Sequence, residues 1–168
     1  MRGRRQTALL ALLVLHGCTS MAPPSAPPPA VPKAGAPPVP RPAALAVERQ
    51  WLQSWFKDTP VRIEQRSEAA FTVEVPREFC FEPGRSEVRP ALGAVLDKLA
   101  QSLLRKPELH VELLAAPGDG AGMSPLARQR ADNVRKDLMA RGVSAQRLAE
   151  PTLATQAAVQ LRIGLPAS

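Results

Sequence analysis

The chain has 168 residues, a formal net charge of +7 and a hydrophobic fraction of 45%. Setting aside a signal-like N-terminus and a proline-rich stretch leaves roughly 105 to 110 residues, enough for one small hydrophobic core. The lysines and arginines form no dense run with interleaved aromatic residues, so the composition argues against nucleic acid as a partner.

Residues 1–17 have the three parts of an export signal peptide. A basic start precedes the apolar core Ala8 to Leu15, and the small residue Gly17 stands just before Cys18. An apolar core of about eight residues is too short to span a bilayer, which takes roughly 20. The segment therefore predicts export rather than a transmembrane helix.

The four residues Leu15-His16-Gly17-Cys18 resemble the lipobox of bacterial lipoproteins, although His16 departs from the usual pattern. The resemblance implies cleavage before Cys18 and acylation of that cysteine, including a palmitate-type chain. Several acyl chains would anchor the protein stably without any transmembrane segment. Thr19, in place of an aspartate, favours the cell outer membrane over the inner membrane. A secretory signal with a chance cysteine, or a soluble chain with an apolar N-terminus, are the alternatives.

Loss of the signal would remove Arg2, Arg4 and Arg5 and lower the formal charge from +7 to +4. That weak positive balance suits an anionic polymer or a lipid surface without identifying either. If Cys18 carries lipid, Cys80 is the remaining cysteine and has no partner, so we expect no internal disulfide.

Residues 18–43 are rich in proline and alanine and predict a linker. Proline fixes φ and lacks an N–H group, so the segment favours extended polyproline II over helix or sheet. At about 3.1 Å per residue, its most proline-rich part, residues 22–42, would reach on the order of 60 Å. A spacer between lipid and domain is one interpretation, and a tail without function is the other.

Residues 44–60 predict an amphipathic helix that holds both tryptophans, and Asp58-Thr59-Pro60 ends it. Its apolar face could pack on the following domain or lie on a membrane. The polar face mixes both signs of charge and is not a cationic stripe, which favours packing on the domain.

Residues 61–168 predict an α/β domain. Residues 61–66 and 71–75 alternate apolar and polar side chains, as a β-hairpin does, until Pro76. An amphipathic helix follows Pro90, with Leu92, Val95, Leu96, Leu99, Leu103 and Leu104 on one face. A strand with Leu109, Val111 and Leu113 inward comes next.

The C-terminal part repeats this pattern. The glycine-rich loop 115–122 leads to Ser124-Pro125, a helix-start signal, and Gly142 is placed to end that helix. Residues 159–165 alternate again as a final strand. The order strand, helix, strand, helix, strand predicts a small sandwich with its helices on one face of the sheet.

These residues carry a family resemblance. The run Phe79 to Ala91, the helix after it, the strand Val111 to Leu114 and the stretch Leu126 to Ala131 resemble the C-terminal peptidoglycan-binding domain of OmpA-like proteins, also found in peptidoglycan-associated lipoproteins. The resemblance covers about three fifths of the chain. In its first half the family usually has a phenylalanine, a short polar turn with small residues, a hydrophobic residue and then a proline. This chain has the same pattern in Phe81, Gly84, Ser86, Val88 and Pro90.

The resemblance implies a ligand site. The family holds the diaminopimelate of the peptide stem with an aspartate in the loop and an arginine in the following helix. A zwitterion needs a carboxylate for its ammonium and a guanidinium for its carboxylate. Arg130 stands at the arginine position, and Asp119 is the one carboxylate in the loop, which is shorter than usual. Met123 replaces the family's asparagine, and the family's histidine and threonine are absent.

Two functions stay open from the sequence. The first is an outer-membrane lipoprotein whose domain faces the periplasm and binds peptidoglycan noncovalently through Asp119 and Arg130, with no cofactor. The second is an accessory protein of an envelope complex that keeps the fold and has lost the ligand. In that case Asp119 is an ordinary turn residue and Arg130 an ordinary surface arginine.

The sequence argues against an enzymatic function. Once His16 is removed with the signal, His110 is the only histidine, and we expect it to face solvent. The sequence indicates no catalytic triad and no cluster of metal ligands. Cys80, between two phenylalanines, is interpreted as a small hydrophobic residue or a surface thiol.

Overall fold

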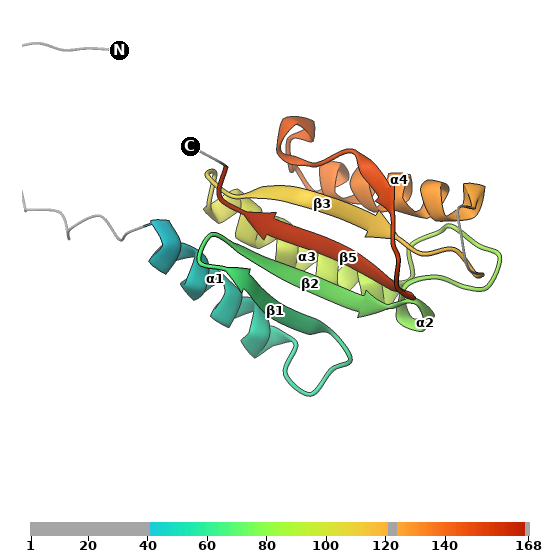
Figure 1. Cartoon of the computed structure of the whole chain (residues 1–168), viewed down its shortest axis with the longest axis horizontal. Coiled ribbons are helices and arrows are strands. Elements are labelled where there is room, and N and C mark those ends of the chain that lie inside the picture. The colour runs from blue at the N-terminus through green and yellow to red at the C-terminus, as the bar shows by residue number, and fades with distance from the viewer. Residues whose placement is uncertain (1–40, 121–123, 167–168) are drawn as a thin grey trace, which may run out of the picture. The chain divides into compact units, whose positions relative to one another are not determined.

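Residues 41–120 and 124–166 are described by a computed structural model. They form a sheet covered on one face by helices (Figure 1). Cys18, Met123 and most of the predicted linker lie outside the described residues. The elements in chain order are α1 (Arg41–Trp55), β1 (Arg62–Ser67), β2 (Ala70–Pro76), α2 (Arg77–Cys80), α3 (Pro90–Arg105), β3 (His110–Ala116), α4 (Pro125–Ala140), the 3₁₀ turn η1 (Ala145–Arg147), β4 (Pro151–Leu153) and β5 (Ala158–Gly164).

The sheet has the strand order β1-β2-β5-β3-β4. β5 lies between β2 and β3 and is antiparallel to both, so β2 and β3 run in the same direction and end at the same edge of the sheet. The predicted α/β sandwich is confirmed, with one correction. The second long helix leads first to β4, parallel to β3, before β5 returns to the centre. β4 has three residues, too few to show an alternating pattern in the sequence.

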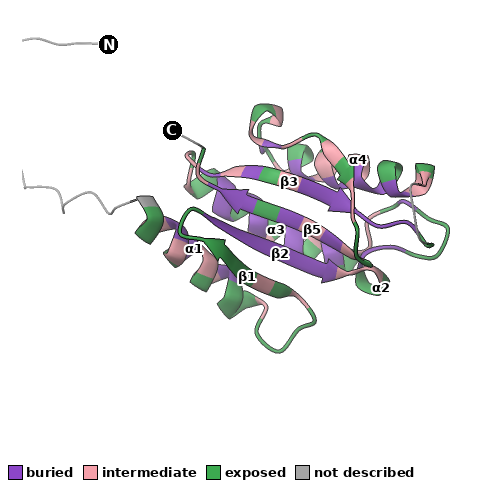
Figure 2. Cartoon of the chain, viewed as in Figure 1, coloured by how far each residue is buried: buried purple, intermediate pink, exposed green. Residues whose placement is uncertain are grey.

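The core lies between this sheet and the helices. In the β2–β5 pairing, Phe71 is opposite Ile163, Val73 opposite Leu161 and Val75 opposite Val159, and all six are buried. Polar residues alternate with them and point to the other face, as the pleat of a strand requires. Figure 2 shows the resulting burial along the central strands.

β3 departs from the predicted alternation. The register shifts between Val111 and Leu113, and Leu114 is buried while Leu113 is only half-buried. A bulge adds one residue to the strand, which reverses the phase of the pattern. Leu114 therefore occupies the inward position that was predicted for Leu113.

Local signals place the ends of the long helices correctly. Pro90 begins α3, and Ser124 caps α4 by accepting a hydrogen bond from the Ala127 N–H at 3.1 Å. Gly142 follows the end of α4 with φ of +92°, a conformation that glycine adopts without steric cost. Leu104, predicted to face inward on α3, is instead 51% exposed, because the stripe through Leu99 and Leu103 already meets the sheet.

Helix α1 spans residues 41–55, whereas the sequence predicted a linker to 43 and a helix over 44–60. Pro42 lies in the first helical turn, where an N–H group has no helical partner to lose. Leu45 and Leu52 are buried against the core. Glu48, 4% exposed, accepts hydrogen bonds of 2.7 Å from Ser102 Oγ and from Arg105 Nη2 of α3. α1 therefore packs on the domain.

Replacing Leu52 with alanine should lower the free energy of unfolding by about 2–5 kcal/mol, because the change leaves a cavity between α1 and the core. Val47→Ala is the matched control, since Val47 lies on the same helix and is 56% exposed. Its effect should stay within about 0.5 kcal/mol. Urea unfolding monitored by tryptophan fluorescence measures both. Equal effects would show that α1 does not unfold with the domain.

Candidate functional site

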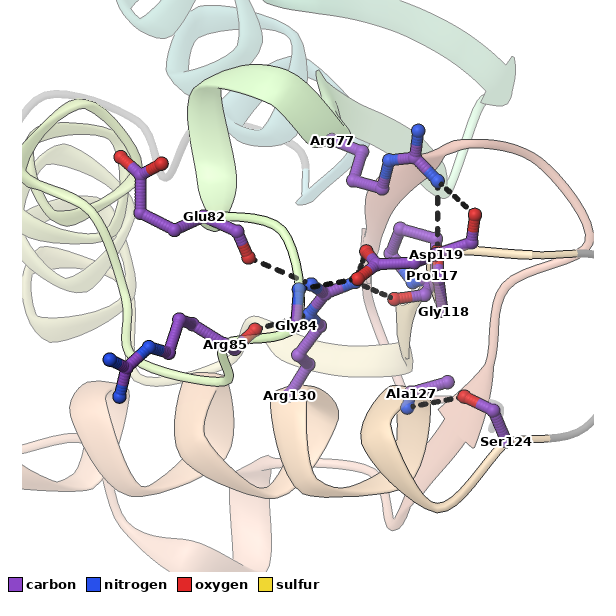
Figure 3. Close-up of polar contacts among 10 residues, drawn as sticks. All are labelled: Arg77, Glu82, Gly84, Arg85, Pro117, Gly118, Asp119, Ser124, Ala127 and Arg130. Atoms are coloured by element: carbon purple, nitrogen blue, oxygen red, sulfur yellow. Dashed lines mark hydrogen bonds and ion pairs between the residues drawn. The ribbon is translucent and has the colours of Figure 1, made fainter.

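One end of the sheet gathers three segments that are distant in sequence. The turn after α2, the loop after β3 and the first turns of α4 meet there (Figure 3). The loop after β3 starts at Pro117, because β3 continues through Ala116. Both residues that the family resemblance assigned to the ligand, Asp119 and Arg130, lie at this meeting point.

Arg130 reaches from α4 into this junction, and its side chain is 0% exposed. Its guanidinium donates hydrogen bonds to the carbonyl oxygens of Arg85 at 2.8 Å, Pro117 at 3.0 Å and Glu82 at 3.1 Å. It also lies 4.8 Å from the centre of the Phe81 ring, within the range of a cation–π contact. The Arg130 side chain therefore connects the turn after α2 and the loop after β3 to α4.

Asp119 completes the bonding of that guanidinium. Its Oδ1 lies 2.8 Å from Arg130 Nη1, and its Oδ2 accepts a hydrogen bond of 2.6 Å from the Gly84 N–H. The Gly84 N–H, and then Arg130, lower the pKa of the Asp119 carboxyl below its usual 3.8. Gly84 has φ of +70°, which favours glycine at this position.

The structure thus brings Asp119 and Arg130 together as a direct pair. The Asp119 side chain remains 37% exposed, while the Arg130 guanidinium has no exposed surface. Only Asp119 can contact a ligand without a rearrangement of the loops. The predicted ligand-binding roles of the two residues stay predictions.

A pocket of about 310 Å³ opens beside Asp119. Its lining combines the 117–120 loop with the segment before β5 and the first residue of α2. The lining residues are Arg77, Pro117, Gly118, Asp119, Gly120, Ala154, Thr155, Gln156 and Ala157. The size is at the lower end of the roughly 300–1,000 Å³ typical of small-molecule sites.

Arg77 is the residue of this pocket that the sequence analysis missed. Its Nη1 donates to the carbonyl oxygens of Gly118 at 3.2 Å and of Asp119 at 3.0 Å. Arg77 directly follows Pro76, the residue predicted to end the strand, and this position could have indicated that Arg77 lies at the end of the sheet. Because β2 and β3 run in the same direction, the residues that follow each strand meet at one edge of the sheet.

The loop passes so close to the N-terminal cap of α4 that position 118 favours glycine, which has no side chain. A Cβ atom built on Gly118 would lie 2.6 Å from the Ser124 Oγ, which caps α4. A side chain at Gly118 would displace that hydroxyl group from its cap. The start of α4 and the loop that carries Asp119 therefore fix one another.

The other residues singled out from the sequence lie away from this pocket. Cys80 is buried, and burial raises the pKa of its thiol to about 12, so it behaves as a small hydrophobic residue. His110 is half-buried rather than solvent-facing, with its Nδ1 3.1 Å from the Glu108 carbonyl oxygen. Within residues 41–120 and 124–166, no three acidic, histidine or cysteine side chains form a group that could hold a metal ion.

Comparison with known proteins rests on structure. No family model matches the sequence, and no curated protein matches it. Among the described helices, none is long and apolar enough to cross a bilayer. Solved structures do match. A MotB-like protein from Desulfovibrio vulgaris aligns with a TM-score of 0.61 and 16% identity, over 75% of this chain and 94% of that one.

Two further structures match at a similar level. The periplasmic domain of Helicobacter pylori MotB aligns with a TM-score of 0.52 and 16% identity, over 66% of this chain and 83% of that one. The cell wall anchor of the T6SS from Pseudomonas aeruginosa aligns with a TM-score of 0.52 and 17% identity, over 76% of this chain and all of that one. At these identities the similarity shows the fold, and the predicted OmpA-like fold is confirmed.

Replacing Asp119 with asparagine should destabilise the protein at pH 7 and progressively less at acidic pH. The folded state lowers the pKa of this carboxyl below 3.8, so its stabilising effect is present above that value and is lost as the pH falls through the lowered pKa. Urea midpoints of the two proteins from pH 7 down to about pH 3 measure the difference. Glu87→Gln is the control, since Glu87 is exposed on the adjoining turn. A difference that does not depend on pH would contradict the ionised pair.

Proposed function

We propose that this chain is an envelope lipoprotein whose OmpA-like domain binds peptidoglycan noncovalently. The observation that carries the proposal is the Asp119 carboxylate, which is held ionised by Gly84 and Arg130 and is still 37% exposed beside a pocket. The T6SS protein with the same fold, described as a cell wall anchor, supports a role at the cell wall.

The proposed ligand is the diaminopimelate of the peptide stem. Its free amino-acid centre carries an ammonium group, and the exposed Asp119 carboxylate is a suitable acceptor for it. Arg130 supports this contact from behind by fixing the position and charge of Asp119. A direct bond between Arg130 and the ligand would require the 117–120 loop to open. On this proposal Asp119 contacts the ligand, and Arg130 contributes through Asp119.

The N-terminal part of the proposal concerns the anchor. Residues 1–17 are the signal peptide, Cys18 carries the lipid in the outer membrane, and the domain faces the periplasm. Since α1 begins at Arg41, the linker of the mature chain runs from residue 18 to 40. At about 3.1 Å per residue it would span roughly 70 Å when extended. Such a linker allows a membrane-anchored domain to reach the wall.

The second candidate is an accessory protein that binds other envelope proteins and not peptidoglycan. The complete burial of Arg130 favours it, because the guanidinium that the family resemblance assigns to the ligand is occupied by backbone carbonyls and Asp119. On this alternative the pair serves only to hold the loops together.

Co-sedimentation with purified peptidoglycan sacculi separates the two functions. The full chain, solubilised in detergent, should sediment with sacculi, and Asp119→Ala and Arg130→Ala should not. Arg130→Ala removes the bonds that hold the loops, so its folding must be checked by circular dichroism. Asp119→Ala removes one partly exposed carboxylate and is the cleaner variant.

Matched controls are available for both positions. Arg128→Ala removes an exposed arginine from the same helix, and Glu87→Ala an exposed carboxylate from the adjoining turn. Both should bind like the unchanged chain. Unchanged binding by folded Asp119→Ala would reject the site. No binding by the unchanged chain, together with specific co-purification of envelope proteins, would select the second candidate.

Replacing Cys18 with alanine should move the protein from the membrane fraction to the soluble periplasmic fraction. The reason is that acyl chains on this residue supply all of the proposed membrane affinity. Fractionation followed by mass measurement of the intact protein tests it. Cys80→Ala is the control and should stay in the membrane fraction. A Cys18→Ala protein that remains acylated and membrane-bound would contradict the lipobox interpretation.

A further inference from the structure

Arg77 lines the pocket beside Asp119, and the described residues bond only one nitrogen of its guanidinium. Its Nη1 is bonded to two backbone carbonyl oxygens of the 117–120 loop. Within the described part of the chain, neither its Nε nor its Nη2 donates to any residue, and no acidic side chain pairs with it. These two nitrogens form the fork that binds a carboxylate through two parallel hydrogen bonds.

The surroundings of Arg77 match this chemistry. Arg77 and Asp119 line the same pocket, and the guanidinium bonds the backbone carbonyl of Asp119 itself (Figure 3). Two residues of opposite charge therefore line one pocket, with the neutral polar residues Thr155 and Gln156 among the other lining groups. By contrast, the guanidinium of Arg130 is already bonded to the carbonyl oxygens of Glu82, Arg85 and Pro117 and to the carboxylate of Asp119.

We propose that Arg77 and Asp119 together bind a zwitterionic amino-acid centre in this pocket, Asp119 accepting from its ammonium and the free edge of Arg77 donating to its carboxylate. The inference rests on the proposed function and deepens it. It assigns the contact with the ligand's carboxylate to Arg77, a residue at the end of β2, and leaves Arg130 as the residue that positions Asp119. A pocket of about 310 Å³ holds one such centre, and the rest of a peptide stem extends outside it.

Two synthetic stem peptides test the assignment. The first carries diaminopimelate with its free ammonium and carboxylate, and in the second that carboxylate is converted to an amide. The full chain in detergent should bind the first peptide more tightly than the second. Arg77→Gln should weaken binding of the first peptide about tenfold, the cost of one charge-assisted contact, and should leave binding of the amide unchanged. Isothermal titration calorimetry measures all four affinities.

The comparison of peptides separates contact from scaffolding. Arg77 also holds the 117–120 loop, so a purely structural role would weaken both peptides equally, and that result would overturn the inference. Equal affinity of the unchanged chain for the two peptides would overturn it as well. Arg62→Gln, which neutralises an exposed arginine at the start of β1, is the control and should change neither affinity. Failure of the unchanged chain to bind sacculi or either peptide would reject the proposed function itself.

Discussion

The end of the domain that carries Asp119 and its pocket depends on one buried cation, Arg130. A guanidinium with no exposed surface loses its hydration and must recover the lost bonds from the protein. Arg130 recovers them from three backbone carbonyls and the Asp119 carboxylate. Those acceptors belong to the turn after α2 and the loop after β3, so satisfying one side chain fixes the relative positions of both segments and α4. One of these segments, the 117–120 loop, also lines the pocket beside Asp119.

In this arrangement Arg130 fixes the position of the Asp119 carboxylate, while Asp119 is the residue of the pair that is exposed. Arg130 and the Gly84 N–H keep Asp119 ionised and oriented, which is the preorganisation that a binding site needs. The same bonds remove Arg130 from the surface. On the proposal that the site binds a zwitterion, another cation has to contact the ligand's carboxylate, and Arg77, next to the end of β2, is the residue proposed for it. The shortened loop is therefore compatible with binding through a different arginine from the one that the family resemblance implies.

The N-terminal helix has a different part in the architecture. α1 is held on the domain by Leu45 and Leu52, which are buried in the core, and by the buried Glu48, which is paired with Arg105 of α3. The folded helix α1 therefore starts at residue 41, and the proposed spacer between Cys18 and the domain includes no part of it. In the proposed lipoprotein this arrangement fixes one end of the linker on the domain, on α1, while the site lies at the edge where β2 and β3 end.

Short-range signals in the sequence determined the long helices and the central strands. Pro90, Ser124 and Gly142 act on neighbouring backbone groups, and the apolar alternation of β2 and β5 follows from the pleat, so these elements could be predicted from local residues. The tertiary structure decided the rest. The three-residue strand β4, the bulge in β3, the burial of Arg130 and the contacts of Arg77 all depend on partners far along the chain. Arg77 meets Asp119 across 42 residues, and Arg130 meets Glu82 across 48. A charged side chain has the same appearance in a sequence whether it is solvated or buried, because its environment is set by the segments that the fold brings to it.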